Sequence, residues 1–412
     1  MNKKLAKVYY ADLWGLRERK YQNLLKSDIQ TTKWKKLKPL PPYYFFVPKD
    51  FALQPEYEKF WKVTDIFKEF KTGIATHRDH FIIGFTKDEI VQRLRIFTGS
   101  LSDDFVMQSL KLKDTRDWKF KEARQKSKKE ELENKICLYA YRAFDTRYIC
   151  YSPVLLEFDR FVLMRHILKG NNISLVTSKI LSSLPFNHVF ISVYIGDNSF
   201  ISNRTKEKNY FFPLYLYPDK SKAQLFERKE YESERISNFT PAFLQAIKES
   251  FGKEPAPEEM FSYIYAILYS PTYRKRYEEF LKIDFPRIPL PSNYEHFQKL
   301  SKLGQELIDL HLLKHPALSS IEISFPRGGS NKVEKVRYEE KAKKLLINKD
   351  QYFENVSKDI WEYRIGAYQV MEKYLKDRKG RKLSLDEINH YLKIAKAIHL
   401  TMEIQKKIDK IK

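Results

Sequence analysis

The tetrapeptide Leu40-Pro41-Pro42-Tyr43 differs at one position from Asn-Pro-Pro-Tyr, whose groups suit the methylation of a nucleobase amine. In that chemistry the asparagine carbonyl and a proline carbonyl accept hydrogen bonds from the amine, and the aromatic ring stacks on the flipped base. Leu40 has no side-chain acceptor. The chain has only 12 glycines, and no glycine-rich turn follows a strand to hold S-adenosylmethionine. The sequence therefore predicts a rigid aromatic loop here and no methyl transfer by this chain alone.

A second arrangement of acidic and basic residues follows Pro218. Asp219 and Glu227-Arg228-Lys229 have the order of a PD-(D/E)xK nuclease, in which both carboxylates meet a metal ion. That chemistry requires the acid and the ExK triplet on adjacent apolar strands. The surrounding residues 218–237 are polar and carry mixed charge, so they predict a linker in which these side chains are catalytically idle.

Residues 76–80, Thr-His-Arg-Asp-His, place two histidines three positions apart with an aspartate between them. The spacing admits a metal site or a kinase-like His-Arg-Asp triplet, but no other histidine or cysteine lies nearby and the other kinase motifs are missing. We therefore predict a polar loop. The chain contains no GxxxxGK[ST] sequence, which argues against a P-loop ATPase. Its two cysteines, Cys137 and Cys150, form neither a disulfide framework nor a metal motif.

The charge of the chain indicates the class of its partner. Lysine and arginine number 76 against 53 acidic residues, which gives a net charge of +23 and a pI of about 9.5. This balance favours a polyanion, with nucleic acid as the first candidate and an acidic membrane surface as the second. No run of about 18 apolar residues is present, so we expect no membrane-spanning helix. The two cysteines fit a cytoplasmic protein with reduced thiols.

Basic and aromatic residues are interleaved in three segments, 272–280, 285–293 and 362–384. Arginine and lysine neutralise phosphates, and arginine, asparagine and glutamine can read base edges in the major groove. For each segment alone a solvated helix face is the simpler interpretation, whereas together, at this net charge, they favour nucleic-acid binding. The predicted DNA-binding residues are Arg274, Lys275, Arg276, Arg287, Asn293, Arg364, Gln369, Lys376, Arg378, Lys379 and Arg381.

The last segment carries the most detailed prediction. Gly366 is expected to break the chain before a short helix over residues 368–378, which Gly380 ends. Arg364 and Gln369 flank the break, where we expect base reading. The cluster at the other end of the helix, Lys376, Arg378, Lys379 and Arg381, would position phosphates. The alternative is that Arg364 pairs with a nearby acid while the basic cluster only offsets the helix dipole.

Hydrophobic patterning places these residues in a mixed fold. Residues 136–217 contain short β-type runs separated by turns. Helices follow from Thr240, residues 320–350 return to short strands, and the tail ends in a helix with the capping box Ser384 and Glu387. We predict an α+β protein with a β-rich lobe followed by a helical lobe with a small sheet. Its expected parts are a trailing segment at 1–118, a charged helical connector at 119–135, a β-rich and then helical domain at 136–330, and a strand and helix tail at 331–412.

Several segments together identify a family. "YYADLWGLRERKYQNLL", "YIYAILYSPTYRKRYEEFLKIDFPRIPLPSN" and "WEYRIGAYQVMEKYLKDRKGRKLS" occur in this order, with shorter matches between them. They resemble the C-terminal target-recognition, or specificity, region of type ISP restriction–modification enzymes and related adenine-specific DNA methylases over nearly the whole chain. The resemblance implies that residues 1–118 are the trailing end of a methyltransferase region and that residues 136–330 are the target-recognition domain.

The resemblance also implies a function, which is sequence-specific recognition of double-stranded DNA for an adenine-N6 methyltransferase or restriction system. The family's catalytic, cofactor, Walker and nuclease motifs are missing from this sequence. We therefore expect no cofactor on this chain and a methyltransferase partner, from a neighbouring gene, that binds S-adenosylmethionine. The alternative to such a split gene is a degenerate remnant that folds from about residue 130 onward. The rival functions are a cryptic DNA methyltransferase or nuclease and a non-specific nucleic-acid-binding protein.

Overall fold

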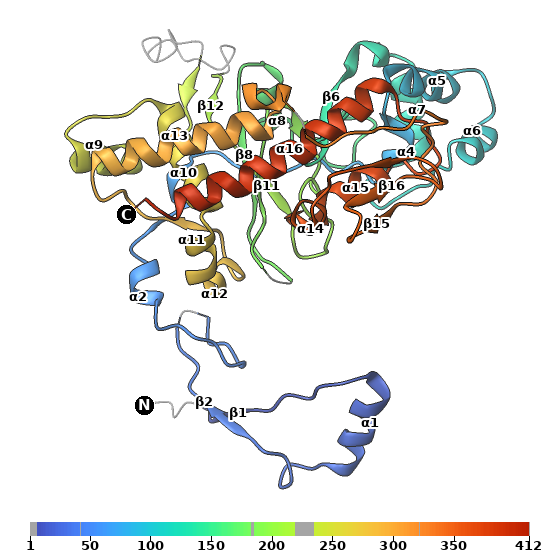
Figure 1. Ribbon diagram of the computed structural model, residues 1–412. Helices are drawn as coiled ribbons and strands as arrows, with labels where there is room; N and C mark the ends of the chain where they lie inside the picture. The colour runs from blue at the N-terminus through green and yellow to red at the C-terminus, as the bar shows by residue number, and fades with distance from the viewer. Residues whose placement is uncertain (1–5, 42, 183–184, 219–234, 321, 412) are drawn as a thin grey trace. The chain divides into compact units, whose positions relative to one another are not determined.

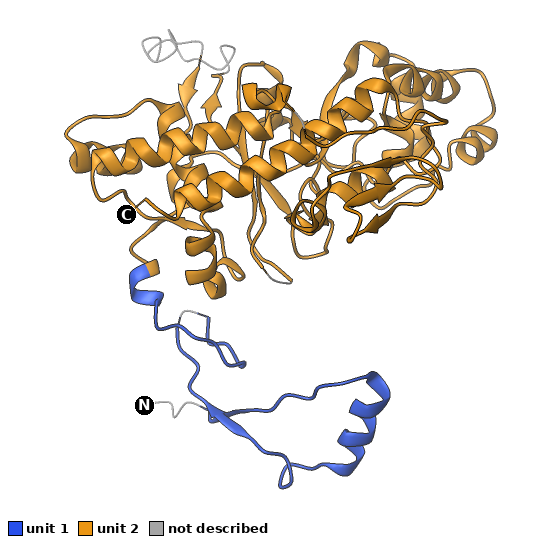
Figure 2. Ribbon diagram, viewed as in Figure 1, with its two compact units in different colours: residues 1–56 blue, residues 57–412 orange. Residues whose placement is uncertain are grey.

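The computed structural model describes residues 6–41, 43–182, 185–218, 235–320 and 322–411 (Figure 1). The chain divides into two compact units, residues 1–56 and residues 57–412 (Figure 2). Helices and small sheets both occur in the second unit, which confirms the predicted α+β class. The predicted boundaries at residues 118, 135 and 330 stay predictions.

The described part of the first unit contains a pair of strands and, between them in the sequence, a helix that has no buried face. β1 (Val8–Tyr10) pairs antiparallel with β2 (Lys35–Leu37), and α1 (Arg17–Lys26) lies between them in the sequence. No residue of α1 is buried, and Leu16 and Leu25 are 78% and 87% exposed. Most helical stability in proteins comes from packing an apolar face, and the described residues give α1 no such packing.

Among the described residues, two four-stranded sheets form the β-rich part of the second unit. One has the order β10-β6-β7-β5, in which β6 and β7 form a hairpin and β10 joins β6 in parallel. The other has the order β4-β11-β8-β9 and is antiparallel. β8 and β9 are buried at every position, including the serines and the threonine of β8. The strands are β4 (Lys71–Thr72), β5 (Ile83–Gly84), β6 (Ile136–Arg142), β7 (Asp145–Cys150), β8 (Ser174–Ser178), β9 (Val189–Ser192), β10 (Ile195–Gly196) and β11 (Asn209–Pro213).

Three long helices pack together in the second unit, and they are α10 (Pro257–Tyr269), α13 (Tyr294–His311) and α16 (Leu385–Ile408). α13 and α16 run alongside each other (Figure 1). α10 and α13 approach so closely that a Cβ on Gly304 would lie 1.9 Å from the carbonyl oxygen of Ser262. α10 is buried from Met260 onward, so it lies in the interior. In the part of the chain that is described, no helix has both the length and the apolar character needed to cross a bilayer.

Shorter elements complete the chain. A three-stranded antiparallel sheet forms from β15 (Arg337–Glu339), β16 (Lys344–Leu346) and β17 (Tyr352–Phe353). The other strand pairs are β3 (Trp61–Lys62) with β14 (Arg287–Ile288), β12 (Tyr215–Leu216) with β13 (Ile236–Ser237), and β18 (Arg364–Ile365) with β19 (Tyr368–Gln369). The other helices are α2 (Gln54–Tyr57), α3 (Val63–Ile66), α4 (Asp79–Ile82), α5 (Lys87–Thr98), α6 (Asp103–Ser109), α7 (Phe120–Ser127), α8 (Phe161–Leu168), α9 (Pro241–Phe251), α11 (Pro271–Arg276), α12 (Glu278–Leu281), α14 (Lys358–Glu362) and α15 (Val370–Lys376), with 3-10 turns at Leu132–Lys135 and Pro316–Ser319.

Local sequence signals set several helix ends. The Thr86 hydroxyl accepts a hydrogen bond from the backbone N–H of Glu89 and caps α5. Gly252 ends α9 in the left-handed conformation, with a φ of +69°. Ser384 and Glu387 form the capping box at the start of α16. The capping box was predicted from the sequence and is confirmed. Each of the three signals depends on residues within a few positions of one another.

The segment expected to be a charged connector packs into the second unit. α7 buries Phe120 and Ala123. The guanidinium of Arg124 is also buried, and it donates hydrogen bonds to the carbonyl oxygens of Phe97 at 2.8 Å and Gly99 at 2.9 Å. α7 therefore has a buried face, in which the alkyl stem of a paired arginine packs with its apolar neighbours.

Candidate nucleic-acid interface

Arg274, the first predicted DNA-binding residue, lies on α11 and is engaged by protein groups. Its Nε donates to the carbonyl of Leu268 at 2.6 Å, and its Nη1 donates to the side-chain oxygen of Asn187 at 3.2 Å. The next two residues, Lys275 and Arg276, are exposed. Arg274 therefore anchors α11, and Lys275 presents its charge to solvent, while Nε of Arg276 donates to the hydroxyl of Tyr277 at 3.2 Å.

Asn187 joins Arg274 to the β18–β19 hairpin. Its side-chain oxygen accepts from Arg274, and its backbone carbonyl accepts from the N–H of Gly366 at 2.7 Å. Gly366 has a φ of +57°, and a Cβ at this position would lie 1.9 Å from the carbonyl oxygen of Ile201. Glycine is the residue that meets both constraints. The structure thus brings the predicted residues of α11 and of the hairpin to one region of the second unit.

Arg364 and Gln369 are register partners across this hairpin. Nε2 of Gln369 donates to the carbonyl of Trp361 at 2.6 Å, so this amide is held by the backbone. Arg364 is exposed, and its Nη1 donates to the carbonyl of Ala367 at 3.1 Å. Within the described residues Arg364 has no ion pair, so the alternative prediction that Arg364 pairs with a nearby acid does not hold there. The break at Gly366 is confirmed, and α15 begins two residues later than predicted.

Arg378 lies in a buried network of ion pairs. Its Nη2 donates to Asp145 at 2.9 Å and its Nε donates to Glu387 at 3.0 Å. The guanidinium carbon stands 3.5 Å from the ring centre of Tyr374. Burial opposes the charged form, but Asp145, Tyr374 and Glu387 together outweigh it, and the pKa of Arg378 is raised. The predicted phosphate contact of Arg378 does not fit this position, because its donors point at groups inside the protein.

The other basic residues of this segment lie nearer the surface. Arg381 is half-buried, and its Nη1 donates to Glu89 at 2.8 Å. Lys376 is exposed and pairs with Glu372, one turn earlier on α15, at 2.9 Å. Lys379 is exposed as well. Exposed pairs of this kind are weak, so Lys376 and Lys379 keep their charges accessible to an anion.

Arg287 and Asn293 stabilise the backbone of the protein. Nη1 of Arg287 donates to the carbonyls of Phe60 at 3.0 Å and Glu58 at 3.3 Å. The side-chain oxygen of Asn293 accepts from the N–H of His296 at 2.8 Å and caps α13. Asparagine is among the preferred N-cap residues, so the local structure accounts for both side chains without a DNA contact.

The Thr-His-Arg-Asp-His segment is built into the fold. Arg78 is buried, and its Nη2 donates to Glu157 at 2.6 Å. Nε2 of His80 lies 3.0 Å from the carbonyl oxygen of Leu110. The predicted polar loop is therefore wrong at Arg78, whose charge is paired in the interior. Over the described ranges, no group of three or more His, Cys, Asp or Glu side chains could hold a metal ion.

The two remaining motifs fall partly or wholly outside the described residues. Leu40 and Tyr43 are exposed in the first unit, and the Tyr43 ring stacks on Phe45 with 5.4 Å between ring centres. Pro42 lies outside the described residues, as do Asp219, Glu227, Arg228 and Lys229.

Comparison with protein families gives a match to the Type ISP C-terminal specificity domain over residues 65–407. The chain belongs to this family. The match confirms the resemblance found in the sequence, and it includes every predicted DNA-binding residue of the specificity domain. A comparison with curated proteins finds no match.

Solved structures with a similar fold include three large proteins. A nuclease-deletion mutant of the Type ISP restriction–modification enzyme LlaGI, in complex with a DNA substrate mimic, has a TM-score of 0.70 and 19% identity, covering 98% of this chain and 39% of that chain. The DrdV–DNA complex has a TM-score of 0.75 and 20% identity, covering 97% and 43%. The ATP-dependent Type ISP enzyme LlaBIII bound to DNA has a TM-score of 0.72 and 17% identity, covering 98% and 28%. The chain spans less than half the length of each, and these identities establish a shared fold.

The specificity domain contains a cluster of arginines that sequence reasoning missed. Phe85 contacts three guanidinium groups, with ring-centre distances of 4.2 Å to Arg147, 4.9 Å to Arg378 and 4.0 Å to Arg381. Arg147 stands on β7, and its Nη2 donates to Asp145, two positions earlier in the sequence, at 2.7 Å. Its aromatic partner is 62 positions away by residue number, so no local pattern could identify it.

Proposed function

We propose that this Type ISP specificity domain recognises target sequences in double-stranded DNA for an adenine-N6 methyltransferase or restriction–modification system. The family match over residues 65–407 carries the proposal. Further support comes from the DNA-bound states of structures with the same fold, LlaGI with a DNA substrate mimic and LlaBIII bound to DNA. The net charge of +23 supplies the attraction for phosphates.

The contact region of this proposal consists of α11 and the β18–β19 hairpin. Lys275 and Arg364 are exposed there, and Asn187 fixes the two elements to each other through Arg274 and Gly366. An arginine on a rigid two-stranded turn can present paired donors to the two acceptors of a guanine, so Arg364 takes the base-reading role. Lys275 takes a phosphate-positioning role.

Selection from randomised duplexes tests the proposal. The purified chain is used to enrich binding sequences, and fluorescence anisotropy then compares the enriched duplex with a scrambled one. We expect the enriched duplex to bind at least about a thousandfold more tightly. Equal affinity for both duplexes would identify a non-specific nucleic-acid-binding protein. Transfer of labelled methyl groups to DNA by the chain alone would identify a cryptic methyltransferase.

We also propose a separate catalytic methyltransferase chain as partner, with S-adenosylmethionine bound by that chain. The first unit supports this by exposing large apolar side chains, among them Trp14 at 77%, Leu16 at 78% and Leu25 at 87%. Exposed apolar patches are typical of protein–protein interfaces.

A binding experiment with the methyltransferase encoded beside this chain tests the partner. Size-exclusion chromatography should give a complex with the wild type and lose it with Trp14→Ser plus Leu25→Ser. Arg19→Ser plus Lys26→Ser, which changes polar side chains of the same unit, serves as the control. Separate elution of the wild type and the methyltransferase would contradict the proposal.

A further inference from the structure

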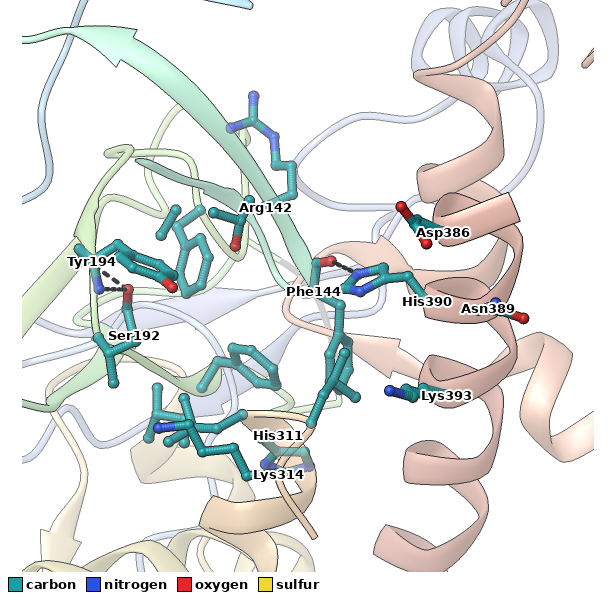
Figure 3. A pocket seen from close by; sticks show the side chains of 18 residues that line it. Arg142, Phe144, Ser192, Tyr194, His311, Lys314, Asp386, Asn389, His390 and Lys393 are labelled. Carbon is teal, nitrogen blue, oxygen red and sulfur yellow. Dashed lines mark hydrogen bonds between the residues drawn. The ribbon is translucent and has the colours of Figure 1, made fainter. Parts of the chain in front are cut away.

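A pocket of about 580 Å³ lies in the second unit, apart from the predicted DNA-binding residues (Figure 3). One wall is the turn between β9 and β10, with Ser192 and Tyr194. The end of α13 contributes Lys314, and the first turns of α16 contribute His390 and Lys393. Its volume lies in the range of sites for small ligands, about 300–1,000 Å³.

Two lysines give this pocket unpaired positive charge. The side chains of Lys314 and Lys393 are exposed, and within the described residues neither has an ion pair or a hydrogen bond. Arg142 also lines the pocket, but its guanidinium pairs with Asp197 at 3.4 Å. Among the described lining residues, Asp386 is the one acid. The charge of the pocket is therefore positive and is carried by flexible ammonium groups.

Lys314 is placed by a strained helix end. Leu313 has a φ of +56°, a left-handed conformation that usually requires glycine. Its N–H donates to the carbonyl of Leu310 at 3.0 Å, and the N–H of Lys314 donates to the carbonyl of Asp309 at 2.8 Å. These two bonds make a Schellman motif with leucine in the glycine position. Backbone strain of this kind concentrates at functional sites, and here it fixes where the Lys314 side chain leaves the helix end.

His390 lies beside Lys393 on α16 and does not add charge to the pocket. Its Nε2 donates to the carbonyl of Phe144 at 2.8 Å (Figure 3). Burial lowers the pKa of the ring, so the neutral form is present at neutral pH. Across the pocket from α16, the ring of Tyr194 supplies a hydroxyl group (Figure 3).

We propose that this pocket binds a phosphate group through the ammonium groups of Lys314 and Lys393, with the Tyr194 hydroxyl as a further donor. Two sources share this chemistry, a phosphate of the DNA backbone and the phosphate of a free nucleotide. The DNA source rests on the proposed function, and it extends the DNA contact from the β18–β19 hairpin to a second place on the specificity domain.

Acetylation of lysines on the wild-type chain tests the pocket directly, with the modification of each lysine measured by mass spectrometry. The chain is labelled alone, with a mixed-sequence duplex, and with dAMP. Lys302 and Lys406 are the reference, because they are exposed on the same two helices and do not line the pocket. Selective protection of Lys314 and Lys393 by the duplex assigns the phosphate to DNA, and protection by dAMP assigns it to a free nucleotide. No selective protection by either ligand would overturn the proposal.

Two double variants distinguish failure of the pocket proposal from failure of the proposed function. Lys314→Ala with Lys393→Ala removes the same charge from the same helices as Lys302→Ala with Lys406→Ala. If the pocket holds one backbone phosphate, the slope of log affinity against log salt falls by about 0.9 more in the first variant than in the second. Equal slopes would exclude the DNA backbone as the source of the phosphate in the pocket. If the wild type binds no duplex, the proposed function fails, and protection by dAMP alone then decides whether the pocket binds phosphate.

Discussion

Asp145 and Arg378 form a buried ion pair, with 2.9 Å between Oδ1 and Nη2, although 233 positions separate them in the sequence. Asp145 also accepts a hydrogen bond from Arg147 at 2.7 Å, and Arg147 lies 3.4 Å from Asp377. Burial opposes the ionisation of Asp145, but the guanidinium groups of Arg378 and Arg147 outweigh it and lower the pKa of Asp145. The network thus ties the β6–β7 hairpin to the segment that was expected to contact DNA.

Replacing Asp145 with asparagine should unfold the specificity domain more easily. The amide keeps the size of the side chain but leaves two buried guanidinium groups without their shared carboxylate. We expect the free energy of unfolding to fall by about 3–5 kcal/mol, measured by urea denaturation. Asp117→Asn, which removes an exposed partner of Arg116, is the matched control and should change little. A loss no larger than that of the control would show that the network does not stabilise the fold.

The contrast between Ser384 and Arg378 explains how much of this structure the sequence could predict. The capping box of Ser384 and Glu387 is complete within four consecutive positions, so its pattern was readable and is confirmed. The environment of Arg378 depends on Asp145, on a hairpin far away in the sequence, and no periodicity records that contact. The sequence predicted one phosphate-positioning role for Lys376, Arg378 and Lys379, whereas packing buries Arg378 and leaves the two lysines exposed.

The same reasoning applies to the pocket. Lys314 and Lys393 are 79 positions apart by residue number. Lys314 follows the end of α13 and Lys393 stands on α16, and only the folded chain brings them to one pocket. The left-handed conformation of Leu313 carries no sequence signal, because the residue usual at such a helix end is glycine. The β18–β19 turn was readable for the opposite reason, since Gly366 is the residue that its conformation requires.

Buried His311 should make the domain less stable in mild acid. Its Nδ1 lies 2.7 Å from the hydroxyl of Tyr265 and its Nε2 lies 3.0 Å from the hydroxyl of Thr401, and burial lowers its pKa to about 3. An unfolded histidine titrates near pH ~6.5, so the unfolded state binds the proton first as the pH falls. The free energy of unfolding should then decrease by up to about 1.4 kcal/mol per pH unit below pH ~6.5, until the folded pKa is reached.

The variant His311→Gln isolates this contribution, because glutamine does not titrate. Urea denaturation at several pH values between the two pKa values should give a smaller pH slope for the variant than for the wild type. His166, whose pKa burial lowers to about 4, remains in both proteins and cancels in the comparison. Identical slopes would mean that His311 takes up its proton in the folded state.

Gly366→Ala should displace the β18–β19 hairpin. The added Cβ meets the carbonyl oxygen of Ile201 at 1.9 Å, and the φ of +57° adds backbone strain. Gly380→Ala is the matched control, because Gly380 has a φ of +84° and no heavy atom within 4 Å of an added Cβ. The control should lose about 1–2 kcal/mol of unfolding free energy from strain alone, and Gly366→Ala should lose more. Equal losses in urea denaturation would contradict the close contact with Ile201.

Lys376→Ala combined with Lys379→Ala should weaken DNA binding equally for all sequences. Both side chains are exposed, and phosphate contacts carry no base information. In anisotropy titrations at several salt concentrations, the slope of log affinity against log salt should fall by about 0.9 for each phosphate that the variant no longer neutralises. Lys406→Ala with Lys407→Ala removes the same charge at the end of α16 and is the control. A slope that matches the control would exclude both lysines from phosphate binding.

The base-reading role of Arg364 gives the sharpest test of sequence recognition. Its guanidinium is exposed on a two-stranded turn that Gly366 and Asn187 hold in place, so its position is fixed while its remaining donors are accessible. Arg364→Ala should cost about 1–3 kcal/mol of binding free energy on the selected duplex and little on random DNA.

Arg364→Lys separates charge from geometry, because lysine keeps the charge and lacks the planar fork that matches two base acceptors. It should therefore bind random DNA like the wild type and still lose affinity for the selected duplex. Arg95→Ala, at an exposed arginine on α5, controls for loss of surface charge. Equal losses on selected and random DNA for Arg364→Ala, with full recovery in Arg364→Lys, would assign Arg364 to the phosphates and leave base reading to other residues.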